Sequence, residues 1–531
     1  MDLTAAIEQW QSLLGEPNVL LQGAAETAYG FDTGGAHRVI VAALRIYDAA
    51  TVQQVMHIAR RHHVCVYPIS TGNNWGYGSS LPVRDGCVIL DLSPLRQILG
   101  FDAELGVVTV QPGVTQQLLA DFLDAGNHPY MVPVTGAGPH CSLMGNALER
   151  GYGITPHADH FGAVTDLEAV LPDGSLYRTA LHEAGGAELA RLFKWGIGPY
   201  SAGLFTQGGF GVVTRMSIVL ARRPECIKAC LFRLNQDALL EPAVLAIRNL
   251  LTQLPGILGA VNLMNQHRVL GMSAPFPHEQ LGADGLIGPT LLAQLGRQHQ
   301  VPPWTGFATL YGTHRVVTAA QKEMRAALSG IASSVTFVSP KRAAALNRVA
   351  HCVPGPLGRR LVGLTHMLRR SLELVAGRPN DMALTLAYWR NPKPQVSPQK
   401  DPARDGCGLL WYSPLVPMRP EGVRAYVNMV RQVTHLHAME PLITLTSLNG
   451  QLFDSTVPLL FDRNQPEAVT TAQACHKDLL VAGRAQGWFP YRVGVETMTH
   501  LAALQADSSA FIDRLRQSVD PDGLMAPGRY S

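Results

Sequence analysis

The chain carries a glycine-rich segment that reads Pro68-Ile69-Ser70-Thr71-Gly72-Asn73-Asn74-Trp75-Gly76-Tyr77-Gly78-Ser79-Ser80. It follows an apolar run at residues 64–67 that predicts a strand. Glycine reaches positive φ and has no side chain in the way, so this loop can bring backbone N–H groups close to an anion. It contains no acidic side chain that would repel a phosphate. The segment predicts a loop that holds a phosphate-bearing cofactor, and a glycine-rich surface turn is the alternative for the loop taken alone.

The composition indicates a globular protein with a large core. Of its 531 residues, 47% are hydrophobic and 16% are charged, which leaves room for two or three domains. The net charge of +3 comes without a dense basic block, so we expect no nucleic-acid partner. No run reaches transmembrane length, and the N-terminus lacks a basic region followed by an apolar core, so we expect a cytoplasmic protein without a membrane partner. The eight scattered cysteines predict buried thiols rather than disulfides or a metal site.

Apolar periodicity and turn residues predict alternating helices and strands in the first half of the chain. An N-terminal helix followed by irregular chain is expected within residues 1–40. Further helices are expected at 49–62, at Ser93-Pro94, at 114–123, at 242–254, after Pro420 and at 510–519, and strands at 88–92, 106–110 and 212–220. A hairpin is expected to turn at Asp173-Gly174. Pro392, Pro394, Pro398 and Pro402 predict an extended connector.

Further glycine clusters stand in order behind the first one. One reads Gly145-Asn146-Ala147-Leu148-Glu149-Arg150-Gly151, followed by Gly153 and by Thr155-Pro156-His157-Ala158-Asp159-His160. Another begins with Gly196-Ile197-Gly198-Pro199-Tyr200 and ends with Gly211-Val212-Val213-Thr214. Near the C-terminus, Tyr491-Arg492 precedes Asp520-Pro521-Asp522-Gly523-Leu524-Met525-Ala526-Pro527-Gly528-Arg529.

In this order the motifs resemble those of the vanillyl-alcohol oxidase / p-cresol methylhydroxylase family of FAD-dependent oxidoreductases, of which the chain looks like a divergent member. The resemblance is strong over residues 40–225 and 488–531 and weaker between them. It implies an α+β fold with a PCMH-type FAD-binding domain at residues 1–224, completed by residues 488–531. It also implies an α+β cap domain at residues 225–487 that covers the flavin ring and supplies much of the substrate pocket.

The resemblance assigns FAD to the glycine clusters. The residues that we expect to bind it are Pro68, Ser70, Thr71, Gly72, Asn73, Asn74, Gly76, Gly145, Asn146, Gly151, Gly153, Thr155, Gly211 and Val213.

Members of the family oxidise para-substituted phenols. The phenol binds as phenolate, hydride leaves the benzylic carbon for flavin N5, and a quinone methide results. The matching residues around the phenol oxygen are Tyr77, Tyr491 and Arg492. Arginine keeps its proton, so Arg492 is a dependable counter-charge. The structural alternatives are a packed ring for Tyr77 and an interdomain ion pair for Tyr491-Arg492.

Two residues are candidates for moving protons. Asp159 matches the family aspartate near flavin N5, where it would take a proton from an alcohol or activate water. Its structural alternative is a helix cap or an acid paired with His160. His157 stands where relatives usually carry tyrosine, and we expect it to line the substrate pocket rather than to act as an acid or base.

The sequence departs from the family at the flavin tether. The oxidase branch attaches its flavin through a histidine four residues before Ser-Pro, where this chain has Leu409. The methylhydroxylase branch uses a tyrosine upstream, and no tyrosine lies between Pro392 and Leu410. We therefore expect non-covalent FAD. A histidine pair of the family is also missing, because Phe453-Asp454-Ser455 stands there.

Three functions remain open at this point. The first is oxidation of a para-substituted phenol or phenolic alcohol, with oxygen or a cytochrome as acceptor. The second keeps the flavin and changes the substrate to a non-phenolic alcohol or natural-product intermediate. The third is a flavin subunit that serves mainly as the partner of an electron-transfer protein. Family habit implies a homodimer, and no metal is expected.

Overall fold

The computed structural model describes residues 2–391, 396–501 and 506–530 and divides the chain into two compact units. Unit 1 contains residues 1–153, 159–222 and 494–531, and unit 2 contains residues 154–158 and 223–493. Pro392 and Pro394 of the expected connector lie outside the described residues. No helix within the described ranges is long and apolar enough to cross a membrane.

One sheet of unit 1 carries the first glycine loop at the end of one of its strands. Its parallel strands are β2 (Ile40–Arg45), β4 (Cys87–Asp91) and β3 (Val66–Ile69), and β1 (Val19–Leu21) pairs with β2 in the antiparallel direction. The helices α1 (Leu3–Leu14), α2 (Gln22–Tyr29) and α3 (Thr51–Arg61) belong to the same unit. The helix predicted at 49–62 is confirmed, with Val52, Val55, Met56 and Ala59 buried. The prediction for residues 1–40 was wrong in part, because β1 and α2 lie where irregular chain was expected.

A second sheet of unit 1 is antiparallel, in the order β5 (Ile98–Asp102), β6 (Val107–Val110), β10 (Val212–Val219), β8 (Val164–Val170) and β9 (Leu176–Arg178). The predicted hairpin at Asp173-Gly174 is confirmed as the β8–β9 turn, where Gly174 has a φ of 85°. The short helix expected at Ser93-Pro94 is wrong. There the N–H of Ser93 donates to Oδ1 of Asp91 at 2.8 Å, and this contact closes a turn instead of starting a helix.

The other elements of unit 1 are short or lie near the second and third glycine clusters. They are α4 (Gln116–Ala125), β7 (Tyr130–Met131), α5 (Leu143–Leu148), α6 (Ala180–Glu183), α7 (Ala187–Ala190), β11 (Ala221–Arg222), α16 (Val495–Leu501) and α17 (Ala506–Val519).

Unit 2 is built on an antiparallel sheet. Its order is β15 (Ser334–Val338), β12 (Cys226–Leu234), β14 (Trp304–Gly312), β13 (Leu258–Asn265), β18 (Thr444–Ser447), β19 (Leu452–Asp462) and β16 (Cys407–Tyr412). β17 (Leu415–Pro417) pairs with the start of β19. Helices α8 (Leu240–Gln253), α11 (His314–Ala327), α14 (Pro420–Leu436) and α15 (Pro466–Ala485) share one hydrophobic core with this sheet.

The core lies on one face of this sheet, because Leu263, Leu445 and Val457 from adjacent strands all join it. Side chains alternate between the two faces of a strand, so their sequence neighbours point to the opposite face. We call this opposite face, in its central part, the polar face. It is formed by Asn262, Thr444, Thr446, Asp454, Thr456 and Trp411, as the strand register shows.

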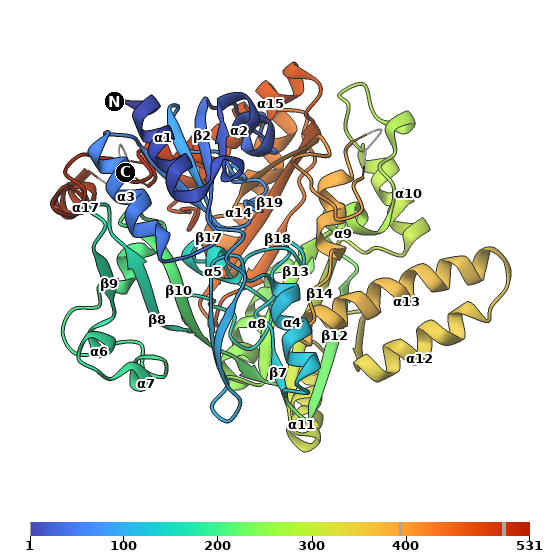
Figure 1. The fold of residues 1–531 in the computed structure, drawn as a ribbon. Coiled ribbons are helices and arrows are strands. Elements are labelled where there is room, and N and C mark those ends of the chain that lie inside the picture. The colour runs from blue at the N-terminus through green and yellow to red at the C-terminus, as the bar shows by residue number, and fades with distance from the viewer. Residues whose placement is uncertain (1, 392–395, 502–505, 531) are drawn as a thin grey trace. The chain divides into compact units, whose positions relative to one another are not determined.

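The remaining helices of unit 2 are α9 (Gln266–Ser273), α10 (Pro289–His299), α12 (Pro340–His351) and α13 (Gly355–Val375). Helices α12 and α13 lie side by side as an antiparallel pair (Figure 1).

Candidate functional site

The first glycine loop leaves the carboxyl end of β3, as the sequence predicted. Gly72, Gly76 and Gly78 all have positive φ, at 69°, 78° and 111°. A Cβ at Gly72 would lie 2.3 Å from Oγ of Ser80, so only glycine fits the loop there. The N–H of Gly76 donates to Oγ1 of Thr33 at 2.8 Å and fixes the far side of the loop. The segment is therefore an ordered loop whose backbone conformation requires glycine.

The first and second glycine clusters lie against each other within unit 1. Oγ1 of Thr71 accepts a hydrogen bond from the N–H of Ser142 at 3.2 Å. A Cβ on Gly145 would lie 2.3 Å from Oγ of Ser70, so the two segments approach closely. Ser142 in turn caps α5, because its Oγ accepts from the N–H of Gly145 at 2.9 Å. Residues predicted to bind one cofactor thus come together from positions some seventy residues apart.

The second cluster is packed around His160. Nδ2 of Asn146 forms a short hydrogen bond with Nδ1 of His160. A Cβ on Gly153 would lie 2.4 Å from Nε2 of His160 and 2.5 Å from the carbonyl oxygen of Val134. A Cβ on Gly151 would lie 2.1 Å from Oδ1 of Asn146. These two glycines are needed because there is no room for a side chain.

The third cluster joins the second through Gln207, whose N–H donates to the carbonyl oxygen of Leu148 at 2.9 Å. A Cβ on Gly211 would lie 2.7 Å from the carbonyl oxygen of Val170. Val213 lies on β10 opposite Ala169 and is buried.

The end of the chain returns to the same part of unit 1. The N–H of Ala526 donates to the carbonyl oxygen of Val66 on β3 at 2.8 Å. Arg529 donates from Nη1 to the hydroxyl of Tyr67 at 2.6 Å and forms an ion pair with Glu149. The C-terminal motif therefore links β3, which carries the first loop, to the second cluster.

Two buried hydroxyl groups in the glycine-rich segments fit the binding of a polar molecule. Oγ of Ser79 and Oγ1 of Thr155 are buried and have no hydrogen-bond partner among the described residues. Buried hydroxyls normally find a partner, so a bound polar molecule is a physical reason for both. The glycine loops, hydroxyls and amides fit the phosphates and ribityl chain of FAD, which carry many acceptors. Pro68 lies within β3 and pairs with Leu90, and Asn73 and Asn74 lie in the loop itself.

The candidate catalytic residues are divided between the units. Tyr77 and Asp159 belong to unit 1, while His157, Tyr491 and Arg492 belong to unit 2. Tyr77 is 8% exposed, and its carbonyl oxygen accepts from the N–H of Val495 at 3.1 Å. Oδ1 of Asp159 accepts from the N–H of Gly162 at 2.8 Å, and the side chain is exposed.

Segment 154–158, which carries Thr155 and His157, is attached to unit 2. The hydroxyl of Tyr311 on β14 donates to the carbonyl oxygen of Ile154 at 3.1 Å. The side chain of His157 is exposed.

The chain just before Tyr491 and Arg492 is held to unit 2 by backbone pairing. Pro490 bridges Pro414, and the carbonyl oxygen of Phe489 accepts from the N–H of Leu415 at 2.8 Å. Leu415 is the register partner of Asp454 on β19. The chain therefore enters Tyr491-Arg492 beside Asp454.

Asp454 is the acidic residue near Arg492. It is 5% exposed, and its Oδ1 has no hydrogen-bond partner among the described residues. Burial raises the pKa of its carboxyl to about 7, although the charge of Arg492 acts in the opposite direction. The sequence showed Asp454 only as a departure from the family, and its burial next to Arg492 makes it part of the candidate site.

Arg268 on α9 is a polar-face residue that sequence reasoning missed. Its Nε donates to Oγ1 of Thr444 at 2.9 Å, and its guanidinium lies 6.0 Å from the ring centre of Trp411. No motif surrounds it in the sequence, so its place becomes visible only when β13, β16 and β18 are assembled.

Leu409, at the expected tether position, lies on β16 opposite Leu460 and is 4% exposed. Its side chain has no nucleophilic atom that could bond to a flavin.

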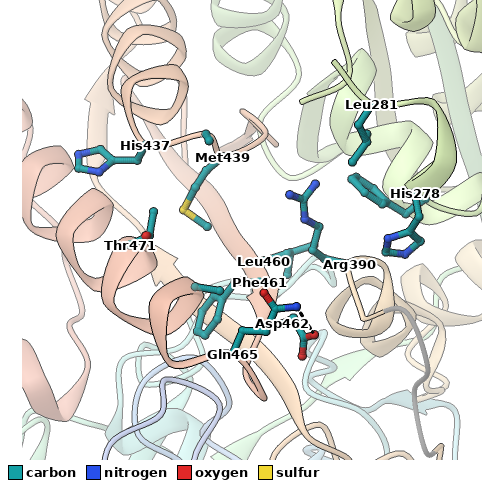
Figure 2. A pocket seen from close by; sticks show the side chains of 13 residues that line it. His278, Leu281, Arg390, His437, Met439, Leu460, Phe461, Asp462, Gln465 and Thr471 are labelled. Carbon is teal, nitrogen blue, oxygen red and sulfur yellow. Dashed lines mark hydrogen bonds between the residues drawn. The ribbon is translucent and has the colours of Figure 1, made fainter. Parts of the chain in front are cut away.

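A cavity of about 260 Å³ lies elsewhere in unit 2, between the start of α15, the end of β19 and the loop after α9. Figure 2 shows Arg390 and His278 on one side of it and Gln465 donating to Asp462 on the other, over 3.1 Å. The guanidinium of Arg390 lies 4.4 Å from the ring centre of Phe276. Its lining includes none of the predicted site residues.

Known proteins resemble this chain over its full length. The family described as "FAD binding domain" matches residues 41–180. The chain is 34% identical to 1'-carboxy-chondrochloren decarboxylase of Chondromyces crocatus, over 99% of this chain and 97% of that protein. It is 26% identical to the flavoprotein subunit of 4-cresol dehydrogenase (hydroxylating) of Pseudomonas putida, over 99% and 95%. The crystal structure of p-cresol methylhydroxylase with substrate bound superimposes with a TM-score of 0.87 at 25% identity, covering 100% of this chain and 96% of that chain.

These similarities extend through both units and agree with the glycine clusters that meet in unit 1. The α+β fold matches p-cresol methylhydroxylase over the whole length, and the FAD-binding part coincides with the first loop and the second cluster. The chain therefore belongs to the vanillyl-alcohol oxidase / p-cresol methylhydroxylase family of FAD-dependent oxidoreductases.

Proposed function

We propose that this enzyme oxidises a para-substituted phenol or phenolic alcohol at its benzylic carbon. The observation that supports the proposal is Arg492, which lies beside the polar face of unit 2 and next to the buried Asp454. A fixed cation favours the phenolate over the phenol, because the charged form gains the Coulomb attraction. The phenolate then pushes electrons toward the para position, and hydride leaves the benzylic carbon that is attached there.

FAD, when bound, supplies the hydride acceptor. The residues of this chain have the other tasks. Arg492 and Tyr491 hold the phenol oxygen, with Tyr77 as the third donor that the family pattern assigns. Asp159 receives the proton of an alcohol substrate, or takes one from the water that adds to the quinone methide. His157 lines the pocket.

An anaerobic screen tests this function. Reduction of the flavin is followed by stopped-flow absorbance with 4-alkylphenols, vanillyl alcohol and matched non-phenolic alcohols. The phenols are expected to bleach the flavin, and the red shift of a bound phenol is expected to disappear in Arg492→Met. Bleaching by non-phenolic alcohols alone would favour the second enzyme function that the sequence left open. An unchanged red shift in Arg492→Met would show that the phenolate binds elsewhere.

A second candidate follows from the likeness to the decarboxylase, which at 34% identity spans nearly the whole chain. In the reaction proposed here for this chain, the phenolic substrate carries a carboxylate on the carbon next to the benzylic carbon. Hydride leaves the benzylic carbon, and the bond to the carboxylate then breaks. Its electron pair forms the new carbon–carbon double bond and restores the phenolate, and CO₂ departs. Release of CO₂ equal to the flavin reduced would support decarboxylation, and a hydroxylated acid as product would exclude it.

The electron acceptor is oxygen or a cytochrome in this proposal. The relative from Pseudomonas putida is a flavoprotein subunit, which keeps the role of partner to an electron-transfer protein open. Mixing reduced enzyme with oxygen in the absence of any partner distinguishes these cases: reoxidation within seconds indicates an oxidase. The proposal further includes a cytoplasmic homodimer with non-covalent FAD.

A further inference from the structure

We infer that Arg268 binds a carboxylate of the substrate, so the enzyme selects phenols that carry an acidic side chain. The inference rests on the proposed function, because it adds a second anchor to the site at which Arg492 holds the phenol oxygen.

The contacts of Arg268 leave part of its guanidinium without an anion. Nε donates to the neutral hydroxyl of Thr444, and the plane lies over Trp411. Nη1 is buried and has no hydrogen-bond partner among the described residues. No carboxylate of the described residues forms an ion pair with it.

An arginine in these surroundings is electrostatically unsatisfied. Burial lowers the pKa of Arg268 to about 10, and no neighbouring acid opposes this change. A buried charge without a partner is costly, and a planar guanidinium matches a carboxylate with paired N–H groups. A carboxylate ligand would therefore stabilise Arg268 more than any neutral group.

The position of Arg268 fits the length of a small phenolic acid. Thr444, which holds it, pairs with Thr456, while Asp454 pairs with Thr446 two residues further along β18. Two residues of a strand span roughly 7 Å. The surroundings of Arg268 and of Arg492 thus lie about one aromatic ring and a short chain apart on the same face of the sheet.

The charges of this face suit a substrate with two anionic groups. Arg268 and Arg492 carry two positive charges. Asp454 is the acid near Arg492, whose charge lowers the pKa of the Asp454 carboxyl and so opposes the effect of burial. With Asp454 protonated, a phenolate and a carboxylate balance the two arginines. With Asp454 ionised, one positive charge remains and still favours the acid over a neutral phenol.

The test compares 3-(4-hydroxyphenyl)propanoate with its methyl ester, which differ in charge at one end only. Both are titrated into the flavin-loaded enzyme, and binding is read from the flavin spectrum; 4-ethylphenol serves as the plain phenol. The wild type is expected to bind the acid more tightly than the ester. Arg268→Met is expected to lose about 10- to 100-fold in affinity for the acid, as for a lost charged hydrogen bond, and to bind the ester within about twofold of the wild type.

The control variant is Arg297→Met, because Arg297 is exposed on α10 of the same unit and should change neither affinity. Arg268→Lys keeps the charge and should recover part of the preference for the acid. If Arg268→Met failed to fold, the wild-type preference and the lysine variant would still decide the matter.

Three results would overturn the inference. They are equal binding of acid and ester by the wild type, an unchanged preference in Arg268→Met, and loss of flavin as the main effect of that variant. In the first two cases, bleaching by 4-ethylphenol would leave the proposed function standing. If no phenol reduced or perturbed the flavin, the proposed function would fail together with the inference.

Discussion

Oγ1 of Thr71 accepts a hydrogen bond from the backbone N–H of Ser142 at 3.2 Å, and this contact joins the first glycine loop to the start of α5. Both residues stand at the edge of segments that sequence patterns assign to one cofactor. The contact shows why glycine recurs in both segments. Two backbones approach closely here, and Ser70 already occupies the space that a side chain at Gly145 would need.

Gly153→Ala is expected to weaken both the fold and flavin binding. The new Cβ would meet His160 at 2.4 Å and the carbonyl of Val134 at 2.5 Å, so a backbone segment must move. Overpacking of this kind costs about 1–3 kcal/mol. The thermal midpoint of unfolding and the flavin-to-protein absorbance ratio after gel filtration measure the two effects. Gly23→Ala is the matched control, because nothing lies within 4 Å of its Cβ position. Equal flavin content in both variants would contradict the assigned role of the second cluster.

The glycine clusters were predictable because each is a local pattern with a local physical reason. The same holds for α3 and the β8–β9 hairpin, whose apolar spacing and turn residues lie within a few positions. Ser93-Pro94 misled because serine followed by proline starts turns as readily as helices, and Asp91 two residues earlier accepts the N–H of Ser93.

The polar face could not be predicted, because its members come from β13, β16, β18 and β19, which are joined by pairing and not by sequence. Arg268 is an isolated arginine in the sequence. Only its contact with Thr444 shows that it faces the same way as Asp454. For the same reason, the sequence showed that Asp454 departs from the family pattern but did not show that its side chain is buried.

Asp454→Asn is expected to raise the free energy of unfolding at neutral and alkaline pH. An aspartate in an unfolded chain has a pKa near 3.9, and burial raises that of Asp454 to about 7 in the folded protein. Between these values the folded state binds more protons than the unfolded state, so stability falls as pH rises from about 4 to 7. Three pH units correspond to at most about 4 kcal/mol, which the neutral amide removes.

Thermal unfolding of Asp454→Asn and the wild type from pH 4 to pH 8 checks this. The difference in stability should grow with pH and level off above pH 7. Glu8→Gln makes the same chemical change at an exposed position of α1 and should show no such trend. A constant difference across the range would mean that the carboxyl of Asp454 is already ionised at acidic pH.

Asp159→Asn is expected to slow turnover by about 10²- to 10⁴-fold while the flavin stays bound, as for the loss of a general base. The amide keeps an oxygen that accepts from the N–H of Gly162, so the local turn survives. The rate of flavin reduction and the rate of product formation are measured separately with an alcohol substrate. If Asp159→Ala and Asp159→Asn both kept full rates, Asp159 would be a residue of the turn only.

Acid precipitation of the yellow protein is expected to leave a colourless pellet, with all flavin in the supernatant. The reason lies on β16, where the buried Leu409 occupies the tether position and offers no atom that could bond to the flavin. The hydrogen bonds of the glycine clusters must then hold FAD alone, so its release should also be reversible. Apoprotein prepared this way in mild acid and salt should regain absorbance and activity when FAD is added. A pellet that stays yellow would reveal a covalent bond through a residue outside the expected positions, and peptide mapping of the flavin would identify it.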